Sequence, residues 1–210
     1  MDLQVIDSTN TKCILGIIDR HVHITGGGGE GEFSSNTPEV QISKIIKHGI
    51  TTVVGLIGTN DLSRSTKKPP SKSQVVKRKR SQYLYISRVY GYPPNIITGD
   101  VRDGIMFLEE VLGLKLAIED HRSSYITKEE LKRLAAYVRV ASILSKKLGF
   151  IHLHMGNGQG LYKMIYEILA ETDLPFSLFS PTHINRNKRL FNASIEFAKR
   201  GDLVGHYVQY

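Results

Sequence analysis

The sequence predicts an α/β fold in which repeated βα units surround a parallel sheet. Short β-branched runs alternate with amphipathic segments at a spacing of roughly thirty residues, which is typical of such units. Capping residues and glycines mark the ends of the amphipathic segments. At 210 residues with 40% hydrophobic content, the chain is long enough for a single good-sized domain.

Six strands are expected, and a seventh begins near the end of the chain. The second run is continuously β-branched, as expected for a strand covered on both faces. The expected strands are Ile17–Ile24, Thr51–Ile57, Tyr83–Val89, Leu114–Ile118, Phe150–Met155, Phe176–Ile184 and the start of Leu203–Gln209.

Helices are expected between most of these strands. Thr37 is placed to cap a first helix that begins at Pro38 and stops at Gly49, and Thr127 with Glu130 forms a capping box for the longest helix. Residues 64–82 stand where a second helix belongs, but their prolines and cations predict a degenerate basic loop or helix. The remaining expected helices are Val101–Leu112, Thr127–Lys147, Leu161–Ala170 and Asn187–Arg200.

The excess of 28 basic over 20 acidic residues gives a net charge of +8, and much of it lies in one stretch. Lys67–Lys72 and Lys77–Arg80 carry no interleaved aromatic residues, so a solvated segment is favoured over nucleic-acid binding. No apolar run reaches the ~20 residues of a membrane helix. The single Cys13 fits a reducing compartment, and the chain is expected to be cytoplasmic with neither a nucleic acid nor a membrane as partner.

Two histidines near the end of the first strand are the strongest chemical signal. His21 and His23 are spaced i, i+2, which puts both imidazoles on one face of a strand and makes half of a metal site. An isolated pair of this kind is more often two hydrogen-bonded histidines at a strand end. The glycine-rich run from Gly26 to Gly31 favours the metal interpretation, because a backbone without Cβ can approach a ligand closely.

Other unusual residues fall at or near the carboxyl ends of later strands, where function collects in parallel βα architectures. His154 and His183 end the fifth and sixth strands, and Lys115 interrupts the apolar fourth strand. A buried lysine is expected to be neutral, paired or modified. It either reaches the rim and pairs with Glu119 or Asp120, or reacts with carbon dioxide to give a carbamate that bridges two divalent ions.

These residues resemble the bacterial isoaspartyl (β-aspartyl) dipeptidases of the amidohydrolase superfamily. The resemblance runs from about Leu15 to Arg200 and rests on motifs in order. They are His-Val-His-Ile-x-Gly-Gly-Gly-Gly-Glu-Gly, Thr-Pro-Glu-Val, Gly-Ile-Thr-Thr-Val-Val-Gly-Leu-x-Gly-Thr, Asp-His-Arg-Ser-Ser, His-Leu-His-Met-Gly and Pro-Thr-His-x-Asn-Arg-Asn. It implies a dizinc hydrolase in which a metal-bridging hydroxide attacks the isopeptide carbonyl of a small dipeptide.

The resemblance assigns roles position by position. His21 and His23 would hold one zinc, His154 and His183 the other, and carbamylated Lys115 would bridge the two ions together with the hydroxide. Tyr90 would steady the carbonyl oxygen, and Glu30 would pair with the substrate ammonium, which makes these two the candidate catalytic side chains. The substrate-binding residues would be Gly28, Gly29, Glu30, Thr59, Tyr90, Arg122 and Arg186.

The resemblance also implies a partial TIM-type (β/α) barrel with six to seven of eight strands. Relative to the family, residues 1–210 are a single barrel domain truncated at both ends, without the strand-eight aspartate that shuttles protons and without the small β-sandwich domain. Family members are expected to form homo-oligomers. Two alternatives stay open: a catalytically inactive metal- or ligand-binding fragment, and a hydantoinase-like enzyme acting on cyclic amides.

Overall fold

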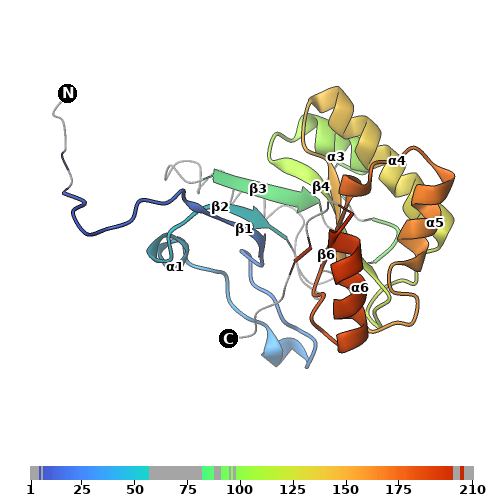
Figure 1. Cartoon of the computed structure of the whole chain (residues 1–210), viewed down its shortest axis with the longest axis horizontal. Helices are drawn as coiled ribbons and strands as arrows, with labels where there is room; N and C mark the ends of the chain where they lie inside the picture. The colour runs from blue at the N-terminus through green and yellow to red at the C-terminus, as the bar shows by residue number, and fades with distance from the viewer. Residues whose placement is uncertain are drawn as a thin grey trace.

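The computed structural model describes residues 5, 7–56, 82–87, 91–94, 96, 98–200 and 204–205. Strands and helices alternate along most of the described chain (Figure 1). The strands are β1 (Ile17–Val22), β2 (Ile50–Gly55), β3 (Gln82–Ser87), β4 (Val111–Ile118), β5 (Phe150–Met155) and β6 (Phe179–Thr182). The α-helices are α1 (Ile42–Lys47), α3 (Val101–Phe107), α4 (Lys128–Ser145), α5 (Lys163–Glu171) and α6 (Lys188–Ala198).

The six strands form one parallel sheet in which the spatial order is the chain order. Parallel neighbours require a crossover connection, and helices supply it between β3 and β6. The expected α/β architecture with a parallel sheet is therefore confirmed. Because every strand runs in the same direction, the carboxyl ends of β1, β4, β5 and β6 lie at one edge of the sheet.

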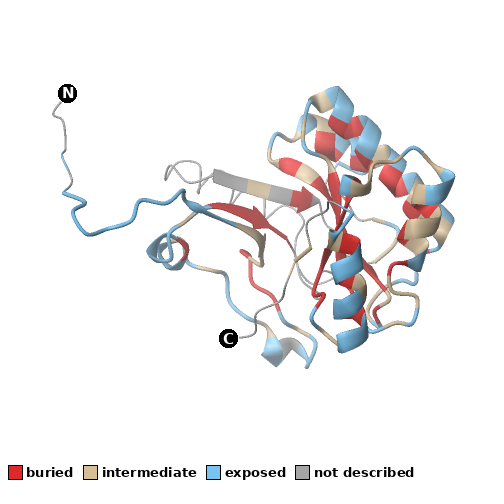
Figure 2. Ribbon diagram, viewed as in Figure 1, coloured by how far each residue is buried: buried red, intermediate tan, exposed pale blue. Residues whose placement is uncertain are grey.

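The main core lies between the sheet and helices α3 to α6, where the buried residues are concentrated (Figure 2). Alternate residues of β4 and β5, such as Leu114, Leu116, Ile151 and Leu153, pack into this core. The capping box predicted for α4 is present, since the Thr127 hydroxyl accepts a hydrogen bond from the Glu130 backbone. These alternations leave every other side chain of β4 and β5 on the opposite face of the sheet.

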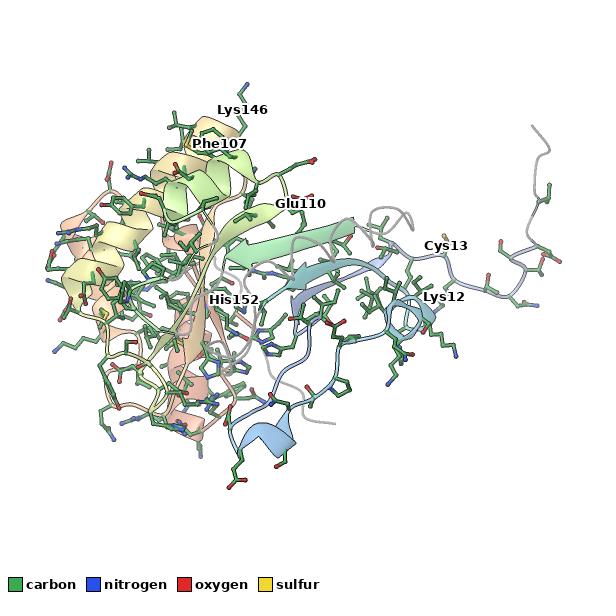
Figure 3. The ribbon with its side chains drawn as sticks, turned by 180° about the vertical axis from the view of Figure 1, so that it is seen from behind. Lys12, Cys13, Phe107, Glu110, Lys146 and His152 are labelled. Atoms are coloured by element: carbon green, nitrogen blue, oxygen red, sulfur yellow. The ribbon has the colours of Figure 1, made fainter. Side chains whose placement is uncertain are left out.

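That opposite face has an apolar end and a polar end. Val54, Ile86 and Phe150 form a second, smaller cluster on it. Further along β5, His152 takes the position after Phe150 on the same face and is paired across the ladder with Lys115 of β4. Figure 3 shows His152 among the strands, away from the surface helices.

The first helix begins later than the sequence predicts. It starts at Ile42 rather than Pro38, and its N-cap residue Gln41 makes no side-chain capping bond. The hydroxyl of Thr37 instead accepts a hydrogen bond from the Gly27 backbone N–H at 2.8 Å. The competing use of this hydroxyl by the glycine loop explains why Thr37 does not cap the helix.

Two other boundaries also differ from expectation. Helix α3 ends at Phe107, and Val111, expected on the inner face of the helix, is the first residue of β4. A short 3-10 helix, Phe176–Leu178, precedes β6 and shortens that strand at its start. Of the expected seventh strand, only Val204 and Gly205 are among the described residues, and Gly205 forms a single parallel bridge with Thr182.

Most of the basic segment 64–82 also lies outside the described residues. Within the described part of the chain, no helix combines the length and apolar character needed to cross a membrane.

Lys147 joins the end of α3 to the segment after α4. Its Nζ donates to the carbonyl oxygens of Ile105 at 2.5 Å and Leu108 at 2.7 Å. Burial lowers the pKa of this amine. The ammonium therefore satisfies carbonyl groups that the end of α3 leaves without helical partners, and it sits at the negative end of that helix.

We expect Lys147→Met to lower the free energy of unfolding by about 2 kcal/mol, because charge-assisted hydrogen bonds to partly buried carbonyls are lost. Lys146→Met is the matched control: Lys146 is exposed and points away from the helices (Figure 3). Urea titrations of both variants check this, and equal midpoints would contradict it.

Candidate metal centre

The structure brings together all five side chains that the sequence analysis assigned to metal binding. His21 lies in β1 and His23 just beyond its end, Lys115 in β4, His154 in β5, and His183 directly after β6. The ring centroids of His21 lie 5.2 Å from His23 and 4.9 Å from His183, and those of His154 and His183 are 4.3 Å apart. Lys115 is only 2% exposed.

A bulge in β1 aims additional side chains into this space. The ladder between β1 and β2 loses register between Asp19 and Val22, so one extra residue is accommodated there. Arg20 reaches Ser180 of β6 with a hydrogen bond of 3.0 Å, while the neighbouring His21 contacts His152. Adjacent residues thus face the same interior, which the simple alternation of a strand does not allow.

His183 has a left-handed backbone, with φ of 62°. Bulky L-residues rarely adopt this conformation, which costs on the order of 1–2 kcal/mol unless surrounding contacts hold it. The reversal directly after β6 turns the imidazole toward His154 and His21.

Burial keeps the imidazoles neutral. It lowers the pKa of His154 to about 4 and that of His183 to about 2, and the Lys115 ammonium contributes to both shifts. The pKa of His21 also falls well below its ordinary value for the same reasons. Neutral imidazoles keep a lone pair available at neutral pH, which is what a metal ion requires.

The imidazoles of this cluster fit zinc, for which neutral imidazole nitrogens are normal ligands. The nitrogens as placed do not converge on one point: among the described residues, no three His, Cys, Asp or Glu side chains are arranged to hold a metal ion. His21 Nδ1 lies 2.9 Å from His152 Nε2, and His154 Nε2 lies 2.6 Å from an Arg186 nitrogen. Reorientation of these rings is needed to present their lone pairs to a shared ion.

Asp120 is a central residue that the sequence analysis did not assign to the site. Its buried carboxylate accepts hydrogen bonds from the backbone, Nε and Nη2 of Arg122 at 2.8–2.9 Å. Its Oδ2 also lies 3.1 Å from His154 Nε2 and 3.5 Å from an Arg186 nitrogen. Burial opposes ionisation of Asp120, but hydrogen bonds from Arg122 and His154 outweigh it and hold its pKa far below the usual range.

The described ion pairs of Asp120 are with arginine and histidine side chains. The signal that could have identified Asp120 is the Asp-x-Arg spacing, which lets an arginine side chain fold back onto a carboxylate. His152, which is not among the assigned ligands, lies against His21 as a buried neighbour.

Candidate substrate-binding groups lie beside this cluster. The Arg122 guanidinium pairs with Glu30 of the loop that follows β1, and Arg186 lies against His154. The Nε of Arg186 is buried and has no hydrogen-bond partner among the described residues, so this N–H can still donate to a ligand. Gly28 and Gly29 both have positive φ, and a Cβ on Gly28 would lie 2.3 Å from the Ser35 carbonyl oxygen, so only glycine fits this turn.

The two remaining sequence-based assignments, Thr59 and Tyr90, lie outside the described residues.

Comparison with solved structures finds similar chains among β-aspartyl dipeptidases. The chain is similar to the β-aspartyl dipeptidase of the thermophilic, keratin-degrading Fervidobacterium islandicum AW-1, a structure in complex with a β-Asp-Leu dipeptide, with 39% identity and a TM-score of 0.87. This chain resembles the β-aspartyl dipeptidases. A second structure of the Fervidobacterium dipeptidase matches equally well, with 39% identity over 90% of this chain and a TM-score of 0.87.

The similarity covers 90% of this chain and 51% of the complexed dipeptidase, so the chain spans about half the length of the dipeptidase structures it matches. A phosphotriesterase homology protein from Escherichia coli, complexed with phosphate in its active site, matches with 13% identity and a TM-score of 0.60, covering 90% of this chain and 69% of that one. This more distant likeness shows a shared fold. No family model matches the chain.

We expect Asp120→Asn to lower the free energy of unfolding by about 3 kcal/mol, because it leaves two guanidinium groups without their buried carboxylate. Asp100→Asn is a matched control: Arg102 folds back onto Asp100 with the same backbone, Nε and Nη2 hydrogen bonds, but at the surface. Asparagine also caps helices well, so this control is expected to change stability by less than about 1 kcal/mol. Equal losses in denaturant titrations of the two variants would contradict the assignment of Asp120.

Proposed function

We propose that the chain hydrolyses β-aspartyl dipeptides with the help of two zinc ions. The observation that carries the proposal is the clustering of the His21, His23, His154 and His183 rings, together with a buried lysine, at one edge of a parallel sheet. The similarity to a β-aspartyl dipeptidase over nine-tenths of the chain supports the same reaction.

His21 and His23 would hold one zinc, and His154 and His183 the other. Lys115 would bridge the ions as a carbamate, formed when its neutral amine adds to carbon dioxide and releases a proton. Its burial supports this role, since the modification replaces a costly buried ammonium by an anion between two cations. Zinc bound there would supply Lewis acidity and would lower the pKa of water far enough to provide a hydroxide nucleophile at neutral pH.

The chain's own residues would hold the charged ends of the substrate. Arg122 and Arg186 offer planar bidentate donors for carboxylates, and the carboxylate of Glu30 offers a partner for the ammonium of the aspartyl residue. In the structure Glu30 and Arg122 pair with each other, so a substrate carrying both charges could exchange with this pair at little electrostatic cost. Gly28, Gly29 and Thr59 would line the same end of the substrate, and Tyr90 would donate to the carbonyl oxygen as charge develops on it.

The charge pattern separates this function from a hydantoinase-like one. A cyclic amide offers no pair of carboxylates and no ammonium, whereas two arginines and a glutamate beside the imidazoles suit a charged dipeptide.

We expect the purified chain, supplied with zinc and bicarbonate, to hydrolyse β-Asp-Leu and to contain two zinc ions per chain by elemental analysis. Lys115→Ala should lower turnover by at least about 100-fold and reduce the zinc content, because the bridging ligand is lost. Lys163→Ala, at a lysine that is 77% exposed on α5, should change neither quantity.

Turnover retained in Lys115→Ala would refute the bridging role. A folded wild-type chain that binds zinc but hydrolyses nothing would identify a metal- or ligand-binding protein instead. Turnover of cyclic amides in place of the dipeptide would favour the hydantoinase-like alternative.

We expect Glu30→Gln to raise KM for β-Asp-Leu at least about tenfold, because it removes a charge-assisted contact to the substrate ammonium. Glu32→Gln is the matched control, since Glu32 is an exposed glutamate two residues along the same loop. Steady-state kinetics with both variants checks the assignment. Equal KM values for Glu30→Gln and wild type would remove Glu30 from the substrate site.

A further inference from the structure

Glu119 is the first residue after β4 and is immediately followed by Asp120. Its backbone is left-handed, with φ of 56°. Such a conformation in a residue other than glycine, asparagine or aspartate persists only where surrounding contacts hold it, and these sites often accompany function.

The contacts that hold Glu119 come from the glycine-rich loop between β5 and α5. The backbone N–H of Gly158 donates to the Glu119 carbonyl oxygen at 2.7 Å, and that of Gly160 donates to its carboxylate Oε2 at 2.8 Å. The N–H of Gly156 donates to the carbonyl of Ile118, the residue before Glu119, at 3.0 Å. The loop therefore encloses both the backbone and the side chain of Glu119.

The alternating glycines of this loop are required by the closeness of Glu119. A Cβ on Gly156 would lie 2.0 Å from the Glu119 carbonyl oxygen, and one on Gly158 would lie 2.0 Å from its Oε2. A Cβ on Gly160 would lie 2.3 Å from Oε1. No side chain fits at these three positions while Glu119 keeps its place.

The same loop is joined to the segment that carries Arg186. The amide of Asn187 donates to the side-chain oxygen of Asn157 at 2.9 Å, and Arg189 donates to the Gly158 carbonyl at 2.9 Å. Glu119 thus lies at the start of a continuous set of contacts that runs from the loop of Arg122, through Gly156–Gly160, to the loop of Arg186.

We propose that Glu119 is a positioning residue that fixes the separation of Arg122 and Arg186 and thereby sets the affinity for the carboxylates of a dipeptide. Its own carboxylate is engaged by the Gly160 N–H, so it acts through the loop and not on the substrate. The effect on affinity for dipeptide carboxylates rests on the function proposed above.

The first test measures the resonances of the two arginine side chains directly and needs no catalytic activity. The Nε–Hε signals of Arg122 and Arg186 are assigned by nuclear magnetic resonance using Arg122→Lys and Arg186→Lys. Glu119→Ala is expected to shift both signals, whereas Glu119→Gln retains an acceptor for Gly160 and should restore them. Glu167→Ala, an exposed glutamate on α5, is the control and should leave both signals in place. Unshifted signals in Glu119→Ala would overturn the proposal.

The second test compares β-Asp-Leu with β-Asp-leucine amide, which lacks one carboxylate. Glu119→Ala should raise KM for the acid about tenfold with kcat within about twofold, because displaced arginines weaken ground-state and transition-state binding alike. The increase should be clearly smaller for the amide, and Glu119→Gln should return KM toward that of wild type. Equal increases for acid and amide, or a fall in kcat alone, would show a merely structural role.

The two proposals fail in different ways. If the wild-type chain neither hydrolyses nor binds the dipeptide by calorimetry, the proposed function fails, and the positioning of the arginines is still decided by the resonance shifts. If the wild type is active and Glu119→Ala matches it on both substrates, only the role of Glu119 is overturned.

Discussion

The buried carboxylate of Asp120 is the interaction on which the arrangement of the site depends. It faces the guanidinium groups of Arg122 and Arg186 and the imidazole of His154, so it balances positive charge at a position that water reaches poorly. Buried ion pairs of this kind repay the cost of desolvation only where hydrogen bonds satisfy the remaining lone pairs. Here the backbone N–H and two nitrogens of Arg122 do so, and this fixes the direction in which the guanidinium points.

Much of the fold follows from patterns that are local in sequence. The capping box at Thr127 and Glu130 and the apolar run of β5 depend on neighbouring residues, and both are found where they were expected. The predicted start of α1 was wrong because the hydroxyl of Thr37 accepts a hydrogen bond from Gly27, ten residues earlier, and does not cap the helix. The predicted end of α3 was wrong because Val111 begins strand β4, which pairs with β3 and β5. Pairing within the sheet, and not helical periodicity, determines the structure of this residue.

The candidate site divides in the same way. His21, His23, Lys115, His154 and His183 could be identified from the sequence because each is chemically unusual at a strand or strand end, and parallel strands bring their ends together. Asp120 and Glu119 were not assigned to the site, because a carboxylate after a strand looks like an ordinary surface residue. Asp120 is buried, and both residues contact groups more than thirty positions away, which local patterns do not reveal.

The N-terminal strand and its loop are attached to the rest of the molecule partly through the site itself. Arg20 contacts Ser180, His21 contacts His152, and Glu30 pairs with Arg122, whereas Ile17 and Ile18 at the start of β1 remain largely exposed. A proposed metal ligand, His21, and a proposed substrate-binding residue, Glu30, thus also attach β1 and its loop to β5 and to the loop after β4. Local unfolding of β1 would therefore also dismantle the imidazole cluster, which couples docking of this strand to assembly of the site.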